Sequence, residues 1–281
     1  MEKLKPKLFS VMKTYTKEQL VKDIVAGVIV AIIALPLSIA LALASGVEPA
    51  CGVYTAIFAG FMVSFLGGSR VQIAGPTAAF ATVVAGIVAT QGMEGLIIAT
   101  ILAGIFLILM GVFKLGSLIK FIPYTITTGF TAGIAVTIFI GQIKDFLGLT
   151  YPDGVRPIET MEKIEANIHS IDTFSWQSLL VGMVCLAILI IYPKFEKKVP
   201  PSLIAVLVGA LMVKFIPGLD DGVKTIGELY TIPAGLPAIG FAGMDISVDK
   251  ITAVLPDAFT IAILAGIESL LSCVVADTMV N

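Results

Sequence analysis

The chain has 281 residues, of which 57% are hydrophobic and 14% are charged, and its mean hydropathy is +1.02. Its formal net charge is only −2. This composition lies far outside the range of soluble globular domains and predicts an all-α integral membrane protein. We expect membrane lipid around it and no nucleic-acid partner.

A window of roughly 20 apolar residues predicts about eight membrane spans. The expected spans are 23–44, 50–66, 76–90, 95–113, 121–142, 176–193, 199–217 and 256–281. The polar stretches 143–175 and 218–255 are expected to be surface loops with short amphipathic or extended pieces. The domain plan is therefore a tail over 1–22 followed by a transmembrane domain over 23–281.

The basic residues predict the orientation in the membrane. Alternate threading of the spans places twelve of the 18 Lys and Arg residues on the side of the N-terminus. They are Lys3, Lys5, Lys7, Lys13, Lys17, Lys22, Arg70, Lys114, Lys120, Lys194, Lys197 and Lys198. Because cytoplasmic loops carry an excess of Lys and Arg, the N-terminus is expected to be cytoplasmic, in the cell (inner) membrane.

The third span begins with a break at membrane depth. Residues 71–74 (VQIA) are expected to be extended, and Gly75 and Pro76 follow them. Glycine allows the backbone to turn, and proline suits the first turn of a helix. A helix is therefore predicted to start near Thr77, inside the bilayer.

A helix that starts inside a bilayer presents free N–H groups and a partial positive charge. The N–H groups of Thr77, Ala78 and Ala79, with the Thr77 hydroxyl, could bind an oxyanion. The small alanines leave room for it. Irregular backbone at this depth is tolerated where it lines a cavity or is buried in protein. The alternative is thus a re-entrant turn sealed by its neighbours.

The last apolar span contains a costly acid, Glu268. A charge there costs at least ~2.5 kcal/mol on insertion scales, so it suggests function by default. Glu268 and Ser272 are four residues apart on one helix face and could bind a proton or a sodium ion. A buried, neutral and purely structural carboxylic acid is the alternative.

Other residues suggest structural roles. Cys51, Cys185 and Cys273 show neither disulfide nor metal-ligand spacing and are interpreted as small core residues. His169 is the only histidine and lies in a polar loop, so we expect neither an enzyme nor a metal site. Four glycines are expected to permit close helix packing. They are Gly104, Gly111, Gly129 and Gly133.

Three separated runs resemble the signature segments of the SulP anion-permease family. They are 34–48, 67–80 (GGSRVQIAGPTAAF) and 266–277 (GIESLLSCVVAD). The resemblance implies a seven-plus-seven inverted-repeat transporter that works as a dimer, with a core domain, a gate domain and a C-terminal STAS domain. The short extended segment before a half-helix belongs to this fold.

The resemblance also implies site residues. The anion would lie at the half-helix start, lined from the first span, and a coupling cation on the last span. The implied anion-binding residues are Pro76, Thr77, Ala78, Ala79, Leu37 and Leu41, and the implied coupling-cation residues are Glu268 and Ser272. Leu37 stands where many relatives have a glutamine or an acid.

The expected function is secondary active transport of a small inorganic anion, of the sulfate or bicarbonate class. Coupling to sodium or protons is expected, and no other cofactor. A nucleobase permease of the same architecture and a channel-like or exchanging anion protein are the alternatives. The chain is expected to hold the first repeat and the start of the second, without the C-terminal half or the STAS domain. The full-length protein is expected to be a homodimer, and these residues alone are not expected to transport.

Overall fold

The computed structural model describes residues 6–117, 124–152, 154–155, 157–196, 199–223, 225–231, 235 and 247–280. Five of the basic residues used for orientation lie outside them: Lys3, Lys5, Lys120, Lys197 and Lys198. The chain divides into two units. Unit 1 comprises Met1–Leu20, Ser38–Ala132 and Ala234–Asn281, and unit 2 comprises Val21–Leu37 and Gly133–Pro233.

The described residues form helices and contain no strand, as the sequence predicts. The α-helices are α1 (Lys7–Val11), α2 (Lys17–Ala44), α3 (Pro49–Leu66), α4 (Ala78–Val112), α5 (Tyr124–Leu147), α6 (Thr160–His169), α7 (Trp176–Ile191), α8 (Pro201–Phe215), α9 (Ile226–Leu229) and α10 (Val248–Val280). Two 3₁₀ turns, η2 (Ile171–Thr173) and η3 (Tyr192–Lys194), flank α7.

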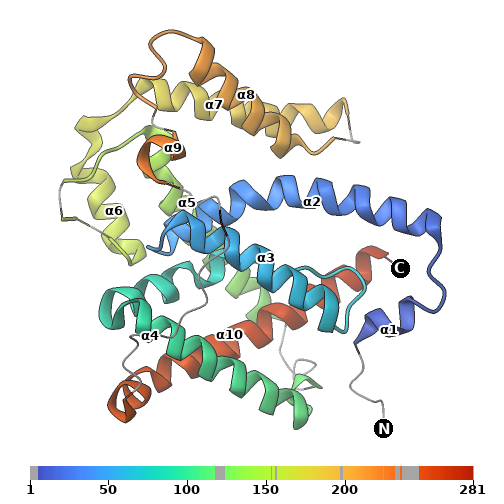
Figure 1. The fold of residues 1–281 in the computed structure, drawn as a ribbon. Coiled ribbons are helices and arrows are strands. Elements are labelled where there is room, and N and C mark those ends of the chain that lie inside the picture. Colours follow the sequence, from blue (N-terminus) through green and yellow to red (C-terminus); the bar gives the residue numbers. More distant parts are fainter. Residues whose placement is uncertain are drawn as a thin grey trace. The chain divides into compact units, whose positions relative to one another are not determined.

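Unit 1 is built on α4 and α10, which lie side by side in Figure 1. Their buried residues are mostly small or β-branched, which lets the two helices approach closely. This core comprises Ile87, Ile98, Ala99, Ala103, Val254, Ala258, Ile261 and Ala262.

The end of α2 packs tightly on α3 in the same unit. A Cβ placed on Gly52 would lie 2.1 Å from the carbonyl oxygen of Ser38 and 2.9 Å from Cβ of Ala42. Only glycine fits at this crossing.

The four glycines that were expected to permit close helix packing have nothing within 4 Å of an added Cβ. They are Gly104, Gly111, Gly129 and Gly133. That prediction is therefore wrong for the described part of the chain, and Gly52 has the role instead.

Helix α4 contains the break expected between its two predicted spans. Gly92 has φ 68° and ψ −173°, a conformation that side chains disfavour. Two helical segments therefore meet at Gly92 without a polar loop. A straight helix of 35 residues would be about 52 Å long, well beyond the bilayer core of about 30 Å.

Helix α10 begins earlier than predicted. It starts at Val248, so Lys250 lies in its first turn and not in a surface loop. There its ammonium group contacts a carboxylate oxygen of Glu94, just after the α4 break, at 2.8 Å. Charged residues lower the hydropathy of a window, which is why the apolar pattern placed the start near 256.

Unit 2 combines apolar helices with polar connections. Helices α7 and α8 lie side by side (Figure 1). The hydroxyls of Ser175 and Ser178 donate to the carbonyl of Gly222 at 3.1 and 2.9 Å. The 143–175 stretch contains the short helix α6, as expected of a surface loop.

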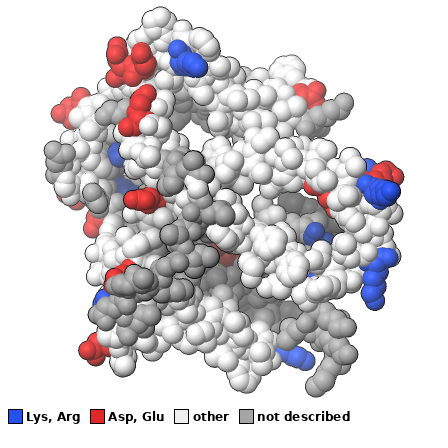
Figure 2. Space-filling view, in the orientation of Figure 1, with Lys and Arg blue, Asp and Glu red and all other residues white. Residues whose placement is uncertain are grey.

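Five helices of the described residues are long and apolar enough to cross a membrane, namely Lys17–Ala44, Pro49–Leu66, Ala78–Val112, Trp176–Lys194 and Val248–Cys273. Helix α8 is apolar but shorter. On the face shown in Figure 2, charged side chains are few and scattered among uncharged ones. Large apolar side chains such as Phe61 and Ile108 are more than 60% exposed, as expected of an integral membrane protein.

Candidate functional site: the start of helix α4

The predicted start of a helix near Thr77 is confirmed. Thr77 is the N-cap of α4, with extended φ −128° and ψ 151°, and Ala78 is the first helical residue. Residues 72–77 before it are neither helix nor strand. The first amides of a helix have no acceptor within it, so the Ala78 and Ala79 N–H groups leave the helix end along its axis. Such an end favours an anion.

The Thr77 hydroxyl does not cap its own helix. It donates to the Oε2 atom of Glu268 on α10, at 3.1 Å, across 191 positions of sequence. Both side chains are half-buried. The structure therefore brings together two residues that the sequence assigned to two different sites.

A second contact joins the same elements. The Gln72 amide nitrogen donates to the carbonyl and hydroxyl oxygens of Ser269, at 3.1 and 3.3 Å. The Cys273 thiol donates to the Gln72 amide oxygen at 2.8 Å. Gln72 was not predicted as a site residue, and Cys273 was expected only in the core. The available sequence signal for Gln72 was its single amide side chain within the otherwise apolar run 71–74.

The other residues predicted to bind the anion differ in burial. Pro76, Ala78 and Ala79 are half-buried at the helix start. Leu41 is half-buried in unit 1, whereas Leu37 belongs to unit 2 and is 55% exposed.

Ser272 is exposed on α10, four residues after Glu268. The roles proposed for these residues stay predictions. The three cysteines are free, as expected, but half-buried and not in the core.

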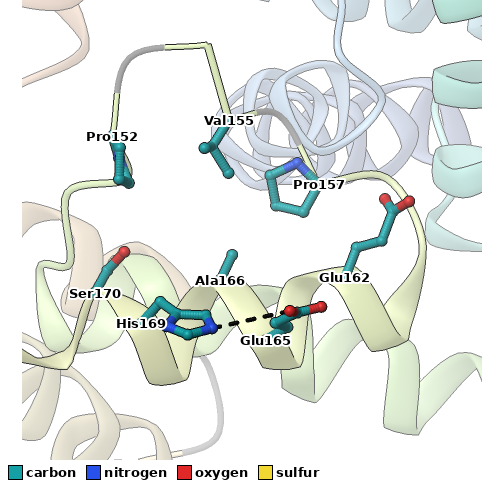
Figure 3. Close-up of a pocket in the computed structure, with 8 residues that line it drawn as sticks. All are labelled: Pro152, Val155, Pro157, Glu162, Glu165, Ala166, His169 and Ser170. Carbon is teal, nitrogen blue, oxygen red and sulfur yellow. Dashed lines mark ion pairs between the residues drawn. The ribbon is translucent and has the colours of Figure 1, made fainter.

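A cavity of about 530 Å³ lies elsewhere, between α6 and the residues before it in unit 2 (Figure 3). Its lining residues are Pro152, Val155, Pro157, Glu162, Glu165, Ala166, His169 and Ser170. His169 Nε2 lies 3.8 Å from a Glu165 carboxylate oxygen, and both side chains are 75% exposed. Carboxylates on the lining disfavour an anion, so this cavity is not the predicted site.

Glu162, one of the residues lining this cavity, has a lowered pKa because it caps α6. The N–H groups of Ile158 and Glu159 donate to Glu162 Oε2 at 2.8 and 3.1 Å. These bonds lower the pKa of the Glu162 carboxyl because they stabilise its charged form. The Glu162 side chain therefore has a capping role at this helix end.

Comparisons with known proteins identify the family of this chain. Residues 20–281 match the model of the sulfate permease family. YvdB of Bacillus subtilis (strain 168), named as a candidate sulfate transporter, is 42% identical over 273 residues, which are 95% of this chain and 49% of that protein. The bicarbonate transporter BicA of Picosynechococcus sp. is 32% identical over 92% of this chain and 46% of its own length.

A solved structure shows the same fold. The transmembrane domain of a cyanobacterial bicarbonate transporter BicA superposes with a TM-score of 0.75 at 29% identity, covering 90% of this chain and 64% of that one. The chain spans about half the length of the curated relatives it matches. With a family match over nearly all its residues, the chain belongs to the sulfate permease family.

Proposed function

We propose that the protein containing this chain is a secondary active transporter of small inorganic anions, of the sulfate or bicarbonate class. Its relatives are named as sulfate and bicarbonate transporters. The observation that carries the proposal is the hydrogen bond from Thr77, at the start of α4, to the Glu268 carboxylate. It joins a helix end suited to an anion to an acid suited to a cation.

The Thr77 hydroxyl can serve either Glu268 or an anion, which gives a physical reason for coupling cation binding to anion binding. Thr77 has one hydroxyl proton, so it cannot donate to Glu268 and to an anion at once. In addition, an ionised Glu268 repels a nearby anion by about 3 kcal/mol, for a separation of ~5 Å and an effective dielectric constant of ~20. A proton or sodium ion on Glu268 removes this repulsion and releases the hydroxyl. The cation therefore favours anion binding, as symport requires.

The remaining site residues act around this pair. Pro76 precedes the Thr77 cap at the helix start, Ala78 and Ala79 donate their N–H groups, and Ser272 adds a hydroxyl beside the cation on Glu268. For Leu37 and Leu41, the proposed anion-lining role is the one that the family resemblance implies.

A nucleobase permease would need free polar side chains for base edges. The Gln72 amide already contacts Ser269 and Cys273 at its two ends. We further propose that the protein is not an enzyme. Support comes from its relatives, which are named as transporters.

The wider assignment follows the lysine distribution and the family. We propose a cytoplasmic N-terminus, an inner-membrane location and a homodimer of the full-length protein. Modification of a cysteine placed near Lys13 by a membrane-impermeant maleimide, in intact cells against lysed cells, tests the orientation. Labelling only after lysis supports it, and equal labelling contradicts it.

The function is tested with the full-length natural protein in proteoliposomes. We expect uptake of labelled sulfate or bicarbonate, stimulated by an inward sodium or proton gradient. In Glu268→Gln, which keeps the shape of the side chain and loses its charge, the stimulation should vanish. Unchanged dependence on the gradient in that variant would argue against coupling through Glu268. Uptake of uracil and of no anion would favour the nucleobase alternative.

A further inference from the structure

The stretch 71–77, called here the entry segment, is held between two helices of unit 1. On one side, a Cβ placed on Gly60 of α3 would lie 3.4 Å from the Ala74 carbonyl oxygen, and one on Gly75 would lie 3.9 Å from Cα of Ala56. On the other side, Gln72 and Thr77 bond to α10. The backbone of this stretch is therefore oriented by tertiary contacts.

The Gln72 side chain contacts one turn of α10 with both of its polar ends. Its amide nitrogen donates to Ser269 and its amide oxygen accepts from the Cys273 thiol. Ser269 and Cys273 are four residues apart, so they share one helix face. A planar amide whose donor and acceptor are both used can occupy only one register along that face.

This register decides where Thr77 lies. Glu268 directly precedes Ser269 on α10, and Thr77 follows Gln72 by five residues. The entry segment is therefore fixed on α10 at two points, by the Gln72 amide and by the Thr77 hydroxyl. Without the first point, the hydroxyl alone would have to hold both the helix start and the carboxylate in place.

We propose that Gln72 is a positioning residue that sets the distance between the α4 helix start and Glu268. This inference rests on the proposed function of Thr77 and Glu268, and it adds a residue with no role of its own in binding. The Gln72 side chain touches neither the anion nor the cation. It acts through the register of the entry segment, and Ser269 and Cys273 are its partners on α10.

The first experiment compares full-length wild type with Gln72→Met, which keeps the length of the side chain and loses both polar ends. We expect KM for the anion to rise about tenfold, with the maximal rate within about twofold, as for the loss of a hydrogen-bonded positioning contact. Ile73→Met is the matched control, because this neighbour is 57% exposed, and its kinetics should be those of wild type.

A second readout needs no transport. In wild type the Cys273 thiol is hydrogen-bonded to Gln72 and half-buried. Alkylation of Cys273 by N-ethylmaleimide, followed by mass spectrometry of its peptide, should be several-fold faster in Gln72→Met than in Ile73→Met. An unchanged rate together with unchanged KM overturns the proposal.

A pair of variants on α10 covers the case in which Gln72→Met does not fold. Cys273→Ser keeps a hydrogen-bond donor to the Gln72 oxygen and should behave as wild type, whereas Cys273→Ala loses the donor and should raise KM several-fold. Equal KM in the two variants overturns the proposal. If wild type takes up no anion, the proposed function fails, and the alkylation rate still decides whether Gln72 holds the segment.

Discussion

The entry segment and helix α6 use their polar side chains in opposite ways. In α6, Glu162 bonds to N–H groups three and four positions away, and His169 lies near Glu165, four positions away. In the entry segment, Gln72 and Thr77 bond to residues 191 to 201 positions away. Hydrogen bonds between residues close in sequence cap a helix but do not attach it to another helix. Distant bonds fix one element on another, as a binding site built from two helices requires.

The largest expected effect tests the tight backbone contacts of unit 1. In Gly52→Ala the new Cβ meets the Ser38 carbonyl oxygen, which cannot move without shifting α2. We expect a loss of about 1–3 kcal/mol or more of stability and a clear fall in Tm of the full-length protein in detergent. Gly104→Ala is the control, with nothing within 4 Å of the new atom. Equal Tm for the two variants would contradict the packing described.

The next effect concerns the distant hydrogen bond itself. Thr77→Val keeps the shape of the side chain and removes the hydroxyl that meets Glu268. When a cation neutralises Glu268, the hydroxyl is released to the anion, and a hydrogen bond to a charged group contributes about 1.5–3 kcal/mol. KM for the anion, measured with the cation gradient, should therefore rise by at least about tenfold. Thr77→Ser, which keeps the hydroxyl, should remain close to wild type. An anion KM that does not distinguish valine from serine would exclude a role for the hydroxyl.

A smaller effect is expected at the ion pair between Glu94 and Lys250. It is distant in sequence like the contacts of Gln72, but its side chains are 44% and 38% exposed. Solvent screening limits such pairs to about 0.2–1 kcal/mol. A double-mutant cycle with Glu94→Gln and Lys250→Met, followed by unfolding in detergent, should give a coupling energy in that range. A coupling above ~2 kcal/mol would show that the pair is shielded from water.

The smallest effect concerns the cap of α6. Because the folded-state pKa of Glu162 lies below its usual value of about 4.5, the cap is fully effective above pH ~4.5 and is lost as the pH falls through the lower folded value. Amide exchange at Ile158 and Glu159, corrected for intrinsic rates, should accelerate only on that acidification. In Glu162→Gln this acceleration of amide exchange should be absent. An acceleration of the same size in the variant would show that another carboxyl group causes it.

These two regions also show what the sequence could predict. The start of α4 near Thr77 and the break between residues 90 and 95 follow from glycine and proline, whose backbone preferences act locally. For the 143–175 stretch, polar composition predicted a surface loop with short amphipathic or extended pieces, and α6 is one such piece.

The partners of Gln72 could not be predicted. Hydropathy and helix spacing place Ser269 and Cys273 on one face of α10, but they do not say which distant segment meets that face. The same limit explains the glycines. Gly52 and Gly104 are equivalent in an apolar helix until the neighbouring backbone is known.

The central claim is that Thr77 and Glu268 act as one unit that couples anion binding to cation binding. The direct test is a double-mutant cycle on the full-length protein, with Thr77→Val, Glu268→Gln and both together, measuring anion KM with and without the cation gradient. We predict non-additive effects without the gradient, with a coupling of at least ~1 kcal/mol that disappears when the cation gradient neutralises Glu268. Additive effects under both conditions would contradict the account.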